Sequence, residues 1–199
     1  MEHSIDLWTL LNDLKIQLTP LSQDYVFKSF DCGVCDLNDF LLNDAKIYLK
    51  YLRYTTFLLE TDTRIIAYYS LANDLLNIVD REDFAEEMDE CKVNIDFEFW
   101  EKFLNQKMYP AAKIGRLAVD KDFQDQGIGT FLINSLVQSF IKKNKTGCQF
   151  ITVDAINDNT QRTIHFYEKN GFKMLTANDY NKPSRQMYKS LLEYIDTDK

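Results

Sequence analysis

The sequence predicts a single domain of the α/β class, in which helices flank a mixed, mostly antiparallel sheet. Hydrophobic residues make up 45% of the 199 residues and aromatic residues 14%, which is enough for a substantial core. Strand-like and helix-like hydrophobic patterns follow each other along the chain. Only six glycines and three prolines interrupt these patterns, so the domain should span residues 1–199.

In the first half of the chain we expect two helices and three strands. Leucines at helical spacing predict a short amphipathic helix over residues 5–15. Residues 25–30 form a strand-like run. Asp36 is a good N-cap residue and is followed by apolar residues at helical spacing, so a helix should begin there. The β-forming runs 55–60 and 64–72 are separated by a short polar turn and predict an antiparallel hairpin.

In the second half, strands and helices alternate. Residues 113–120 predict a strand and residues 127–143 a helix with an apolar stripe. A further buried strand is expected over 149–155, and a helix over 159–170 with Gly171 as its C′ residue. Two more strands, 172–175 and 185–191, should complete the sheet.

Acidic residues are concentrated between these halves, in an insertion at about residues 77–109. Residues 80–106 hold ten acidic and three basic residues and contribute −7 of the net charge of −8. Aromatic residues within the segment predict one or two helices that pack on the domain, with a solvated acidic face. The segment could also attract a cationic amine or a basic peptide. The charge distribution lacks the excess of basic residues that is typical of a nucleic-acid binder, although it is compatible with a local basic face.

Targeting and redox features are sparse. The N-terminus lacks the basic and apolar regions of a signal peptide, and no stretch approaches the roughly 20 apolar residues of a membrane span. Four cysteines are too few for a disulfide scaffold in a chain of this size. We therefore expect a cytoplasmic protein with reduced thiols and no membrane partner.

The segment that points most directly to a ligand is the turn from Gln124 to Gly129. Two glycines separated by one residue open a helix directly after a strand, so several N–H groups can converge on one point. The positive end of the helix dipole favours a pyrophosphate there. Walker A loops need Gly-Lys-Ser/Thr, and the dinucleotide fingerprint needs a third glycine where Leu132 stands. Alone, the pattern leaves phosphate binding and close helix–sheet packing equally open.

Together with the later run IHFYEKNGF at residues 164–172, this turn resembles the GNAT superfamily of N-acetyltransferases. That family is marked by a Q/R-x-x-G-x-G/A turn followed by an F-Y-E-K-x-G-F run. Further stretches resemble its toxin-type subgroup, whose members acetylate the amino group of aminoacyl-tRNA. These stretches are residues 30–33, 37–41, 65–71 and 115–119.

The resemblance implies a GNAT-like fold that uses acetyl-CoA as cosubstrate and requires no metal. Main-chain groups of the central strand would bind the pantetheine arm, and the N–H groups after it the pyrophosphate, with Gln124 at the rim. Tyr167 would lie near the thioester sulfur and protonate the leaving thiolate. The implied coenzyme A-binding residues are Leu117, Ala118, Val119, Gln124, Asp125, Gln126, Gly127, Ile128, Gly129 and Thr130.

Several other residues could take part in chemistry. Cys32 and Cys35 have the spacing of a redox pair at a helix start, or are two small buried thiols. Asp154 could relay a proton or be a structural hydrogen-bonding residue. Arg116 could orient an acidic substrate or support the fold, and His165 is expected to have a surface or packing role.

Three functions remain open at this point. The first is transfer of acetyl to a primary amine of a small molecule or protein. The second is toxin-type acetylation of aminoacyl-tRNA, with tRNA and an antitoxin as partners. The third is a non-catalytic module that binds acyl-CoA. The resemblance also allows a homodimer.

Overall fold

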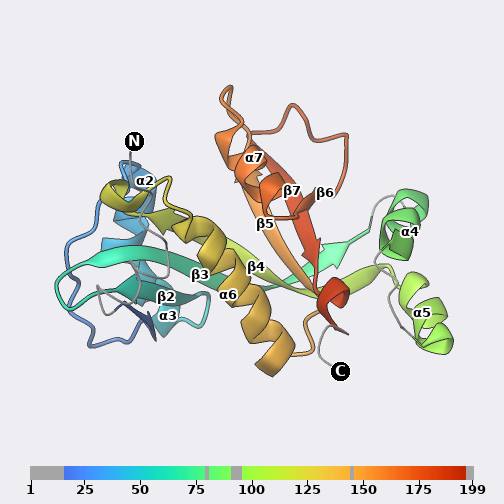
Figure 1. The fold of residues 1–199 in the computed structure, drawn as a ribbon, viewed down its shortest axis with the longest axis horizontal. Helices are drawn as coiled ribbons and strands as arrows, with labels where there is room; N and C mark the ends of the chain where they lie inside the picture. Colours follow the sequence, from blue (N-terminus) through green and yellow to red (C-terminus); the bar gives the residue numbers. More distant parts are fainter. Residues whose placement is uncertain (1–15, 79–80, 91–95, 144–145, 196–199) are drawn as a thin grey trace, which may run out of the picture. The chain divides into compact units, whose positions relative to one another are not determined.

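The computed structural model describes residues 16–78, 81–90, 96–143 and 146–195 (Figure 1). The predicted helix at residues 5–15 lies outside them. The elements are β1 Gln17–Pro20, α2 Cys35–Asp39, π-helical η1 Phe40–Asp44, α3 Ala45–Lys50, β2 Thr55–Glu60, β3 Ile65–Asn77, α4 Arg81–Glu90, α5 Phe97–Leu104, β4 Met108–Val119, 3₁₀-helical η2 Lys121–Phe123, α6 Ile128–Lys143, β5 Phe150–Ile156, α7 Arg162–Lys169, β6 Lys173–Met174, β7 Ser184–Ser190 and 3₁₀-helical η3 Leu192–Tyr194.

The described residues fall into two compact units. The first unit contains residues 16–72 and Ile114–Ser135, and the second contains the remaining residues from Asn73 to Lys113 and from Leu136 onward. Strands follow the order β1-β2-β3-β4 in the first unit and β3-β4-β5-β7-β6 in the second. The α/β class, with a mixed, mostly antiparallel sheet flanked by helices, is confirmed.

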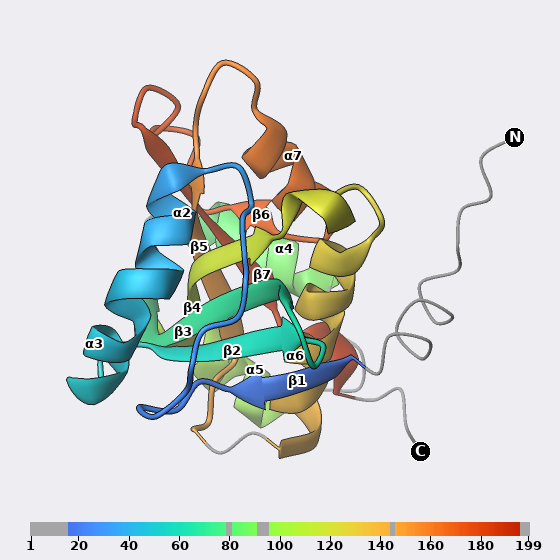
Figure 2. The ribbon, with the colours of Figure 1, turned by 90° about the vertical axis from the view of Figure 1, so that its left-hand side faces the viewer.

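In the first unit, the predicted hairpin forms from β2 and β3. The two strands pair antiparallel, with a register shift at Leu59/Glu60. β1 pairs antiparallel with the other edge of β2, so that β1, β2 and β3 lie side by side (Figure 2). The hairpin prediction was right, but β3 continues to Asn77 instead of ending at residue 72.

The predicted strand at residues 25–30 was wrong. Only an isolated bridge between Ser29 and Arg64 forms there. β1 already occupies the free edge of β2, and the Leu21 N–H extends this contact by donating to the Thr56 carbonyl at 2.8 Å. Residues 25–30 instead contribute side chains, such as the Tyr25 hydroxyl that donates to the Glu60 carboxylate.

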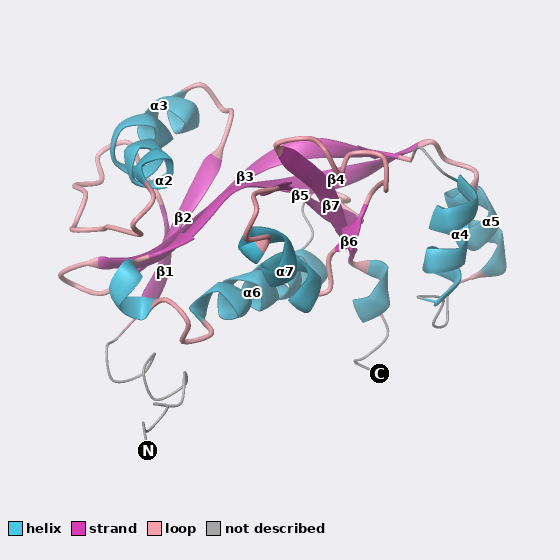
Figure 3. Ribbon diagram, turned by 90° about the horizontal axis from the view of Figure 1, so that it is seen from above, coloured by secondary structure: helices cyan, strands magenta, loops and turns pink. Residues whose placement is uncertain are grey.

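Helices α2 and α3, joined by η1, cover one face of β2 and β3 (Figure 3). Aromatic and aliphatic side chains from both layers form the core of the first unit, and the Tyr68 hydroxyl donates to the Leu37 carbonyl at 2.7 Å. The helix begins one residue before Asp36, which lies in the first turn, and Val34 occupies the N-cap position. The N-cap prediction for Asp36 was therefore wrong.

In the second unit, β7 pairs antiparallel with both β5 and β6. Helix α7 starts at Arg162, later than predicted, because the Asp158 carboxylate accepts the N–H groups of Thr160 and Gln161 and holds them in a turn. The helix ends at Lys169, and Gly171 follows the C-cap Asn170 as the predicted C′ residue. Gly171 has a φ of +78°, which favours glycine.

The acidic insertion forms two helices, α4 and α5, as the sequence predicts. The Ile78 N–H donates to the Lys107 carbonyl at 3.0 Å at the base of the insertion, and β4 begins at Met108, earlier than predicted. Apolar side chains of both helices join the core of the second unit. Its buried members include Leu76, Phe84, Met88, Trp100, Phe103, Tyr109, Phe150 and Tyr188.

Candidate functional site

The glycine-containing turn lies in the first unit, between the end of β4 and the start of α6 (Figure 2). Asp125 and Gly127 both have left-handed backbone dihedrals, with φ values of +60° and +81°. Aspartate and glycine tolerate this region better than other residues do. A Cβ atom at Gly127 would meet nothing within 4 Å, so this position faces open space.

The backbone donors at the start of α6 are free to bind a ligand. Within the described ranges, no hydrogen bond engages the N–H of Gly127, Ile128, Gly129 or Thr130, and the first bond of the helix runs from the Phe131 N–H to the Gly127 carbonyl at 3.0 Å. Four unpaired N–H groups at the positive end of a 16-residue helix suit an anionic group such as a pyrophosphate.

Two glutamine side chains brace this turn. Gln124 Nε2 donates to the carbonyls of Cys32 at 2.9 Å and Val119 at 3.0 Å. Gln126 Nε2 donates to the Asp122 carbonyl at 3.1 Å. The side-chain amide of Gln124 therefore ties the turn to the end of β4 and to the loop before α2.

Asp120 is a structural centre that the sequence analysis missed. The residue is buried, with only 3% of its side chain exposed. One carboxylate oxygen accepts from Arg64 at 2.7 Å and from the Asp122 N–H at 3.1 Å, and the other accepts the Asp31 N–H at 3.1 Å. The only feature of the sequence that could have indicated this role is the position of an acidic residue directly after a buried strand. This network fixes the chain where β4 ends and the turn begins.

Asp31 extends the same network. Its carboxylate accepts from Lys121 Nζ and Asn38 Nδ2, both at 2.8 Å, and from the Gly33 N–H at 2.9 Å. The hydrogen bond from Lys121, followed by those from Gly33 and Asn38, holds the pKa of Asp31 well below its usual range. Asp31 is thus ionised at neutral pH and anchors the loop that precedes α2.

Leu117, Ala118 and Val119 lie at the end of β4, next to the turn. Ala118 is buried in the core of the first unit, whereas Leu117 and Val119 are half-buried. A Cβ atom at Gly115 would lie 2.1 Å from Tyr54 Cε1, so the absence of a side chain lets this ring pack against the strand. The structure brings all the predicted coenzyme A-binding residues together in the first unit.

Arg116 lies on the same strand and has mainly internal contacts. Its guanidinium lies 5.2 Å from the centroid of the Phe40 ring, and Nη1 donates to the Gly115 carbonyl at 2.8 Å. Arg116 Nε is 3.8 Å from an Asp36 carboxylate oxygen. These contacts favour the supporting role over an interaction with substrate.

Tyr167 lies in the second unit, on α7, and its side chain is 5% exposed. The rings of Phe166 and Phe172 both pack edge-on against it, with centroids 5.1 Å away. Burial raises the pKa of the Tyr167 phenol, which therefore stays protonated at neutral pH. Its hydroxyl has no hydrogen-bond partner in the described part of the chain and can donate to a ligand.

The other candidates have structural surroundings. Cys32 is buried and Cys35 exposed, both as free thiols, and burial raises the pKa of Cys32, which is the opposite of an activated redox thiol. Asp154 is paired with Lys113, and His165 is exposed. The described residues contain no group of three or more potential metal ligands. None of the described helices is long and apolar enough to cross a membrane.

Solved structures share this fold. A tyrosine-to-phenylalanine mutant of KacT is 20% identical, with a TM-score of 0.65 over 88% of this chain and 95% of that chain. AtaT complexed with acetyl-methionyl-tRNAfMet is 20% identical, with a TM-score of 0.66 over 88% and 94%. A mutant AtaT toxin bound to acetyl-CoA and the C-terminus of the antitoxin AtaR is 19% identical, with a TM-score of 0.61 over 92% and 98%.

No curated protein sequence matches the chain significantly. A family model does: the acetyltransferase (GNAT) domain matches residues 53–174, which is more than half of the sequence. The matched segment contains the acidic insertion, the turn before α6 and Tyr167. The chain belongs to the GNAT family of acetyltransferases, whose cosubstrate is acetyl-CoA.

Proposed function

We propose that this acetyltransferase transfers the acetyl group of acetyl-CoA to a primary amine of a small molecule or protein. The observation that supports donor binding most directly is the set of unpaired N–H groups from Gly127 to Thr130. A diphosphate can accept these bonds without a lysine or arginine in the turn, because main-chain dipoles and the helix end supply the positive potential.

Each residue of the turn has a role in this proposal. The N–H groups of Gln126 to Thr130 hold the diphosphate, and Asp125 gives the turn its left-handed bend. Main-chain groups of Leu117, Ala118 and Val119 hold the pantetheine arm. Gln124 positions the turn through its side-chain amide, because both of its acceptors are backbone carbonyls of the first unit.

Tyr167 is proposed as the general acid. A neutral amine attacks the thioester carbonyl, a C–N bond forms, and the C–S bond breaks. The Tyr167 hydroxyl gives its proton to the departing sulfur, and the amine nitrogen loses a proton to solvent. Burial raises the pKa of the phenol, so the hydroxyl is protonated before the sulfur departs.

A second candidate acceptor is the amino group of an aminoacyl-tRNA. It is favoured by the likeness to AtaT, which was solved with acetyl-methionyl-tRNAfMet and with the C-terminus of an antitoxin. In that case an antitoxin would be a further partner. The same proposal includes a homodimer and a single domain that spans both units. It also includes a cytoplasmic location, where acetyl-CoA is available.

An acceptor screen tests the proposal. Acetyl-CoA is incubated with the full chain and with polyamines, amino acids, peptides or charged tRNAs, and released coenzyme A is quantified by chromatography. Thiol reagents are avoided because Cys35 is exposed. We expect turnover with at least one class of amine. Tight binding of acetyl-CoA without any turnover would indicate the non-catalytic module, and absence of both would overturn the proposal.

Gly127→Glu should weaken acetyl-CoA binding by at least about 100-fold in calorimetry, because a carboxylate would compete with the diphosphate for the same N–H groups. Gly127→Gln is the matched control, since both variants place a side chain of equal size at a φ of +81°. Glutamine should therefore bind acetyl-CoA more tightly than glutamate does at this position. Equal affinities of the two folded variants would contradict a diphosphate at this turn.

A further inference from the structure

Helix α3 of the first unit ends in an exposed apolar segment (Figure 2). Ile47 lies on the helix, Tyr51 is its C-cap residue and Leu52 follows directly, and their exposed fractions are 53%, 73% and 93%. Ile47 and Tyr51 are one helical turn apart, so they lie on the same side of the helix. Neighbouring exposed apolar side chains, unlike scattered ones, are typical of an interaction surface.

Leu52 occupies a backbone position that favours glycine. Its φ is +57°, in the left-handed region. The helix ends in a Schellman motif, in which the Leu52 N–H donates to the Leu49 carbonyl at 3.1 Å and the Arg53 N–H to the Tyr48 carbonyl at 2.9 Å. Because the Leu52 side chain is almost wholly exposed, packing within the chain does not compensate for the strain. A contact with a partner explains a leucine here better than the stability of the chain does.

Positive charge accompanies these apolar side chains. Residues 46–54 include three basic residues and no acidic one. Lys50 Nζ lies 5.7 Å from the centroid of the Tyr51 ring, and the Arg53 guanidinium 5.4 Å from that of Tyr48. Both cations are exposed, and neither forms an ion pair within the part of the chain that the structure describes. This surface, called the α3 face below, therefore suits a partner with acidic and apolar side chains.

Helix α5 of the second unit has the complementary features. Residues 96–102 include three acidic residues and one basic residue, Lys102, which pairs with Glu98 at 2.6 Å. Glu98 and Glu101 are both exposed. Phe99 lies between them in the sequence and is 44% exposed. These three residues, called the α5 face below, combine an exposed aromatic ring with negative charge.

We propose that the α3 face of one copy of this chain docks on the α5 face of a second copy. The two cations of the α3 face meet Glu98 and Glu101 of the second copy, and Leu52 covers its Phe99 ring. Two α3 faces do not pair with each other, because cations would then meet cations. Since the two faces differ, the contact runs head to tail and can extend into a ring or a filament. It does not depend on the proposed acetyl transfer.

Charge reversal tests the contact, with the average mass of the full chain measured by sedimentation velocity. Lys50→Glu with Arg53→Glu reverses the α3 face, and Glu98→Lys with Glu101→Lys reverses the α5 face. Each double variant alone should associate at least about tenfold more weakly than the unmodified chain, because like charges then face each other. An equimolar mixture of the two variants again brings opposite charges together and should recover the association.

Equal masses for the unmodified chain and both double variants at the same concentration would overturn the proposal, as would a mixture that does not exceed its components. A labelled RNA hairpin is titrated in parallel. If the unmodified chain binds this RNA through Lys50 and Arg53 but does not self-associate, the α3 face is a nucleic-acid surface and the proposal is wrong.

Leu52→Gly separates the contact from the stability of the chain. Glycine adopts a φ of +57° without strain, so the Tm should not fall, whereas self-association should weaken at least about tenfold. Leu18→Ala is the matched control, since Leu18 is 41% exposed. Its register partner Leu59 follows Leu58, which faces α2 and α3, so Leu18 lies on the opposite face of the sheet. Full self-association with Leu52→Gly, or an equal loss with Leu18→Ala, would refute the role of Leu52.

Discussion

The side chain of Tyr167 combines deep burial with a hydroxyl that is available to a ligand. Most buried hydroxyls donate to a neighbouring carbonyl, as Tyr68 and Tyr109 do in this chain. Tyr167 differs because its ring is held by Phe166 and Phe172, while no described residue accepts from its oxygen. Aromatic packing thus positions the phenol without using its proton.

Tyr167→Phe should therefore lower kcat about 100-fold and change the affinity for acetyl-CoA by less than about twofold, because only the proton donor is removed. Steady-state kinetics and calorimetry measure the two effects separately. Tyr109→Phe is the control, since it deletes a buried hydroxyl that donates to the Phe103 carbonyl at 2.6 Å. It should reduce stability and leave kcat unchanged. A Tyr167→Phe variant with full kcat but weakened donor binding would contradict the acid role.

At the scale of elements, the turn before α6 depends on contacts made far away in sequence. Asp120 joins the end of β4 to Arg64 on the loop before β3, 56 residues earlier, and to the Asp31 N–H, 89 residues earlier. Gln124 reaches Cys32, 92 residues earlier. These bonds hold the turn in position when no ligand is bound, which reduces the entropy lost on binding.

Asp120→Asn should lower the free energy of unfolding by about 2–4 kcal/mol. The asparagine oxygen can accept from Arg64 or from the Asp31 N–H, but its NH2 group, which is a donor, cannot accept from the other. Urea denaturation measures this loss. Acetyl-CoA affinity should fall as well, since the turn loses its anchor. Asp62→Asn, at an exposed position of the β2–β3 turn, should change stability by less than about 0.5 kcal/mol. Similar losses in both variants would show that the network contributes little.

Elements with strong periodicity could be predicted from the sequence. The β2–β3 hairpin and helices α6 and α7 follow from alternation, helical spacing and turn residues. β1 could not be predicted, because a short, mostly exposed strand that ends in a proline lacks a hydrophobic pattern. Residues 25–30 have the hydrophobic pattern of a strand, but β1 already pairs with the free edge of β2. Tertiary pairing, and not the local pattern, therefore determines which of the two segments becomes a strand.

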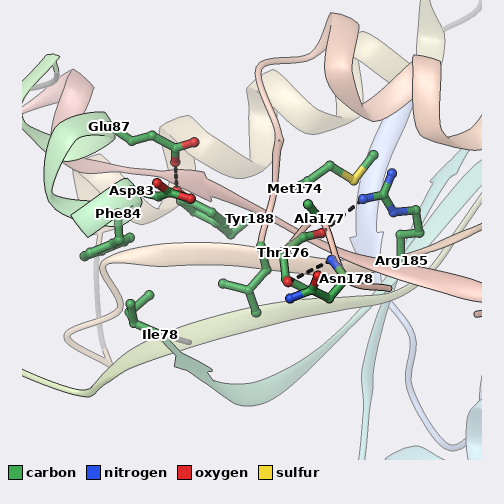
Figure 4. A pocket seen from close by; sticks show the side chains of 11 residues that line it. Ile78, Asp83, Phe84, Glu87, Met174, Thr176, Ala177, Asn178, Arg185 and Tyr188 are labelled. Carbon is green, nitrogen blue, oxygen red and sulfur yellow. Dashed lines mark hydrogen bonds between the residues drawn. The ribbon is translucent and has the colours of Figure 1, made fainter. Parts of the chain in front are cut away.

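The candidate site was predictable only in part. Glycine spacing placed the turn correctly between β4 and α6, since backbone conformation is local information. The bracing by Asp120 and Gln124 was not predictable, because it depends on which distant segments the fold brings near. A cavity beside α4 (Figure 4) was likewise not predictable, because its lining comes from α4, from β7 and from the segment after β6, which are far apart in the sequence.

At the scale of the whole molecule, negative charge and apolar burial coexist in the same helices. Helices α4 and α5 contain most of the acidic residues of the chain's insertion, yet Phe84, Trp100 and Phe103 are buried in the core of the second unit. The described carboxylates of these helices are exposed or half-buried. Their negative charge therefore stays outside the apolar core of the second unit.

Buried tyrosines couple the stability of the whole molecule to alkaline pH. Burial raises the pKa of Tyr69 to about 12, and also raises the pKa of Tyr68 and Tyr167 above the usual value of about 10. Above pH 10 the unfolded chain has lost phenolic protons that the folded chain still holds. Since stability falls with pH wherever the unfolded state binds fewer protons, this contribution is complete below pH 10 and is lost as pH rises toward 12.

The free energy of unfolding should therefore be nearly constant between pH 8 and pH 9.5 and fall steeply above pH 10, with about 2 kcal/mol lost through Tyr69 alone by pH 12. Urea denaturation across this range measures the slope. Tyr69→Phe keeps the ring that stacks on Phe57 at 5.0 Å but removes the titrating group, so its slope above pH 10 should be smaller than that of the unmodified chain. Parallel pH profiles for the two proteins would mean that the Tyr69 phenol ionises as readily in the folded chain as in the unfolded one, which contradicts its exposed fraction of 4%.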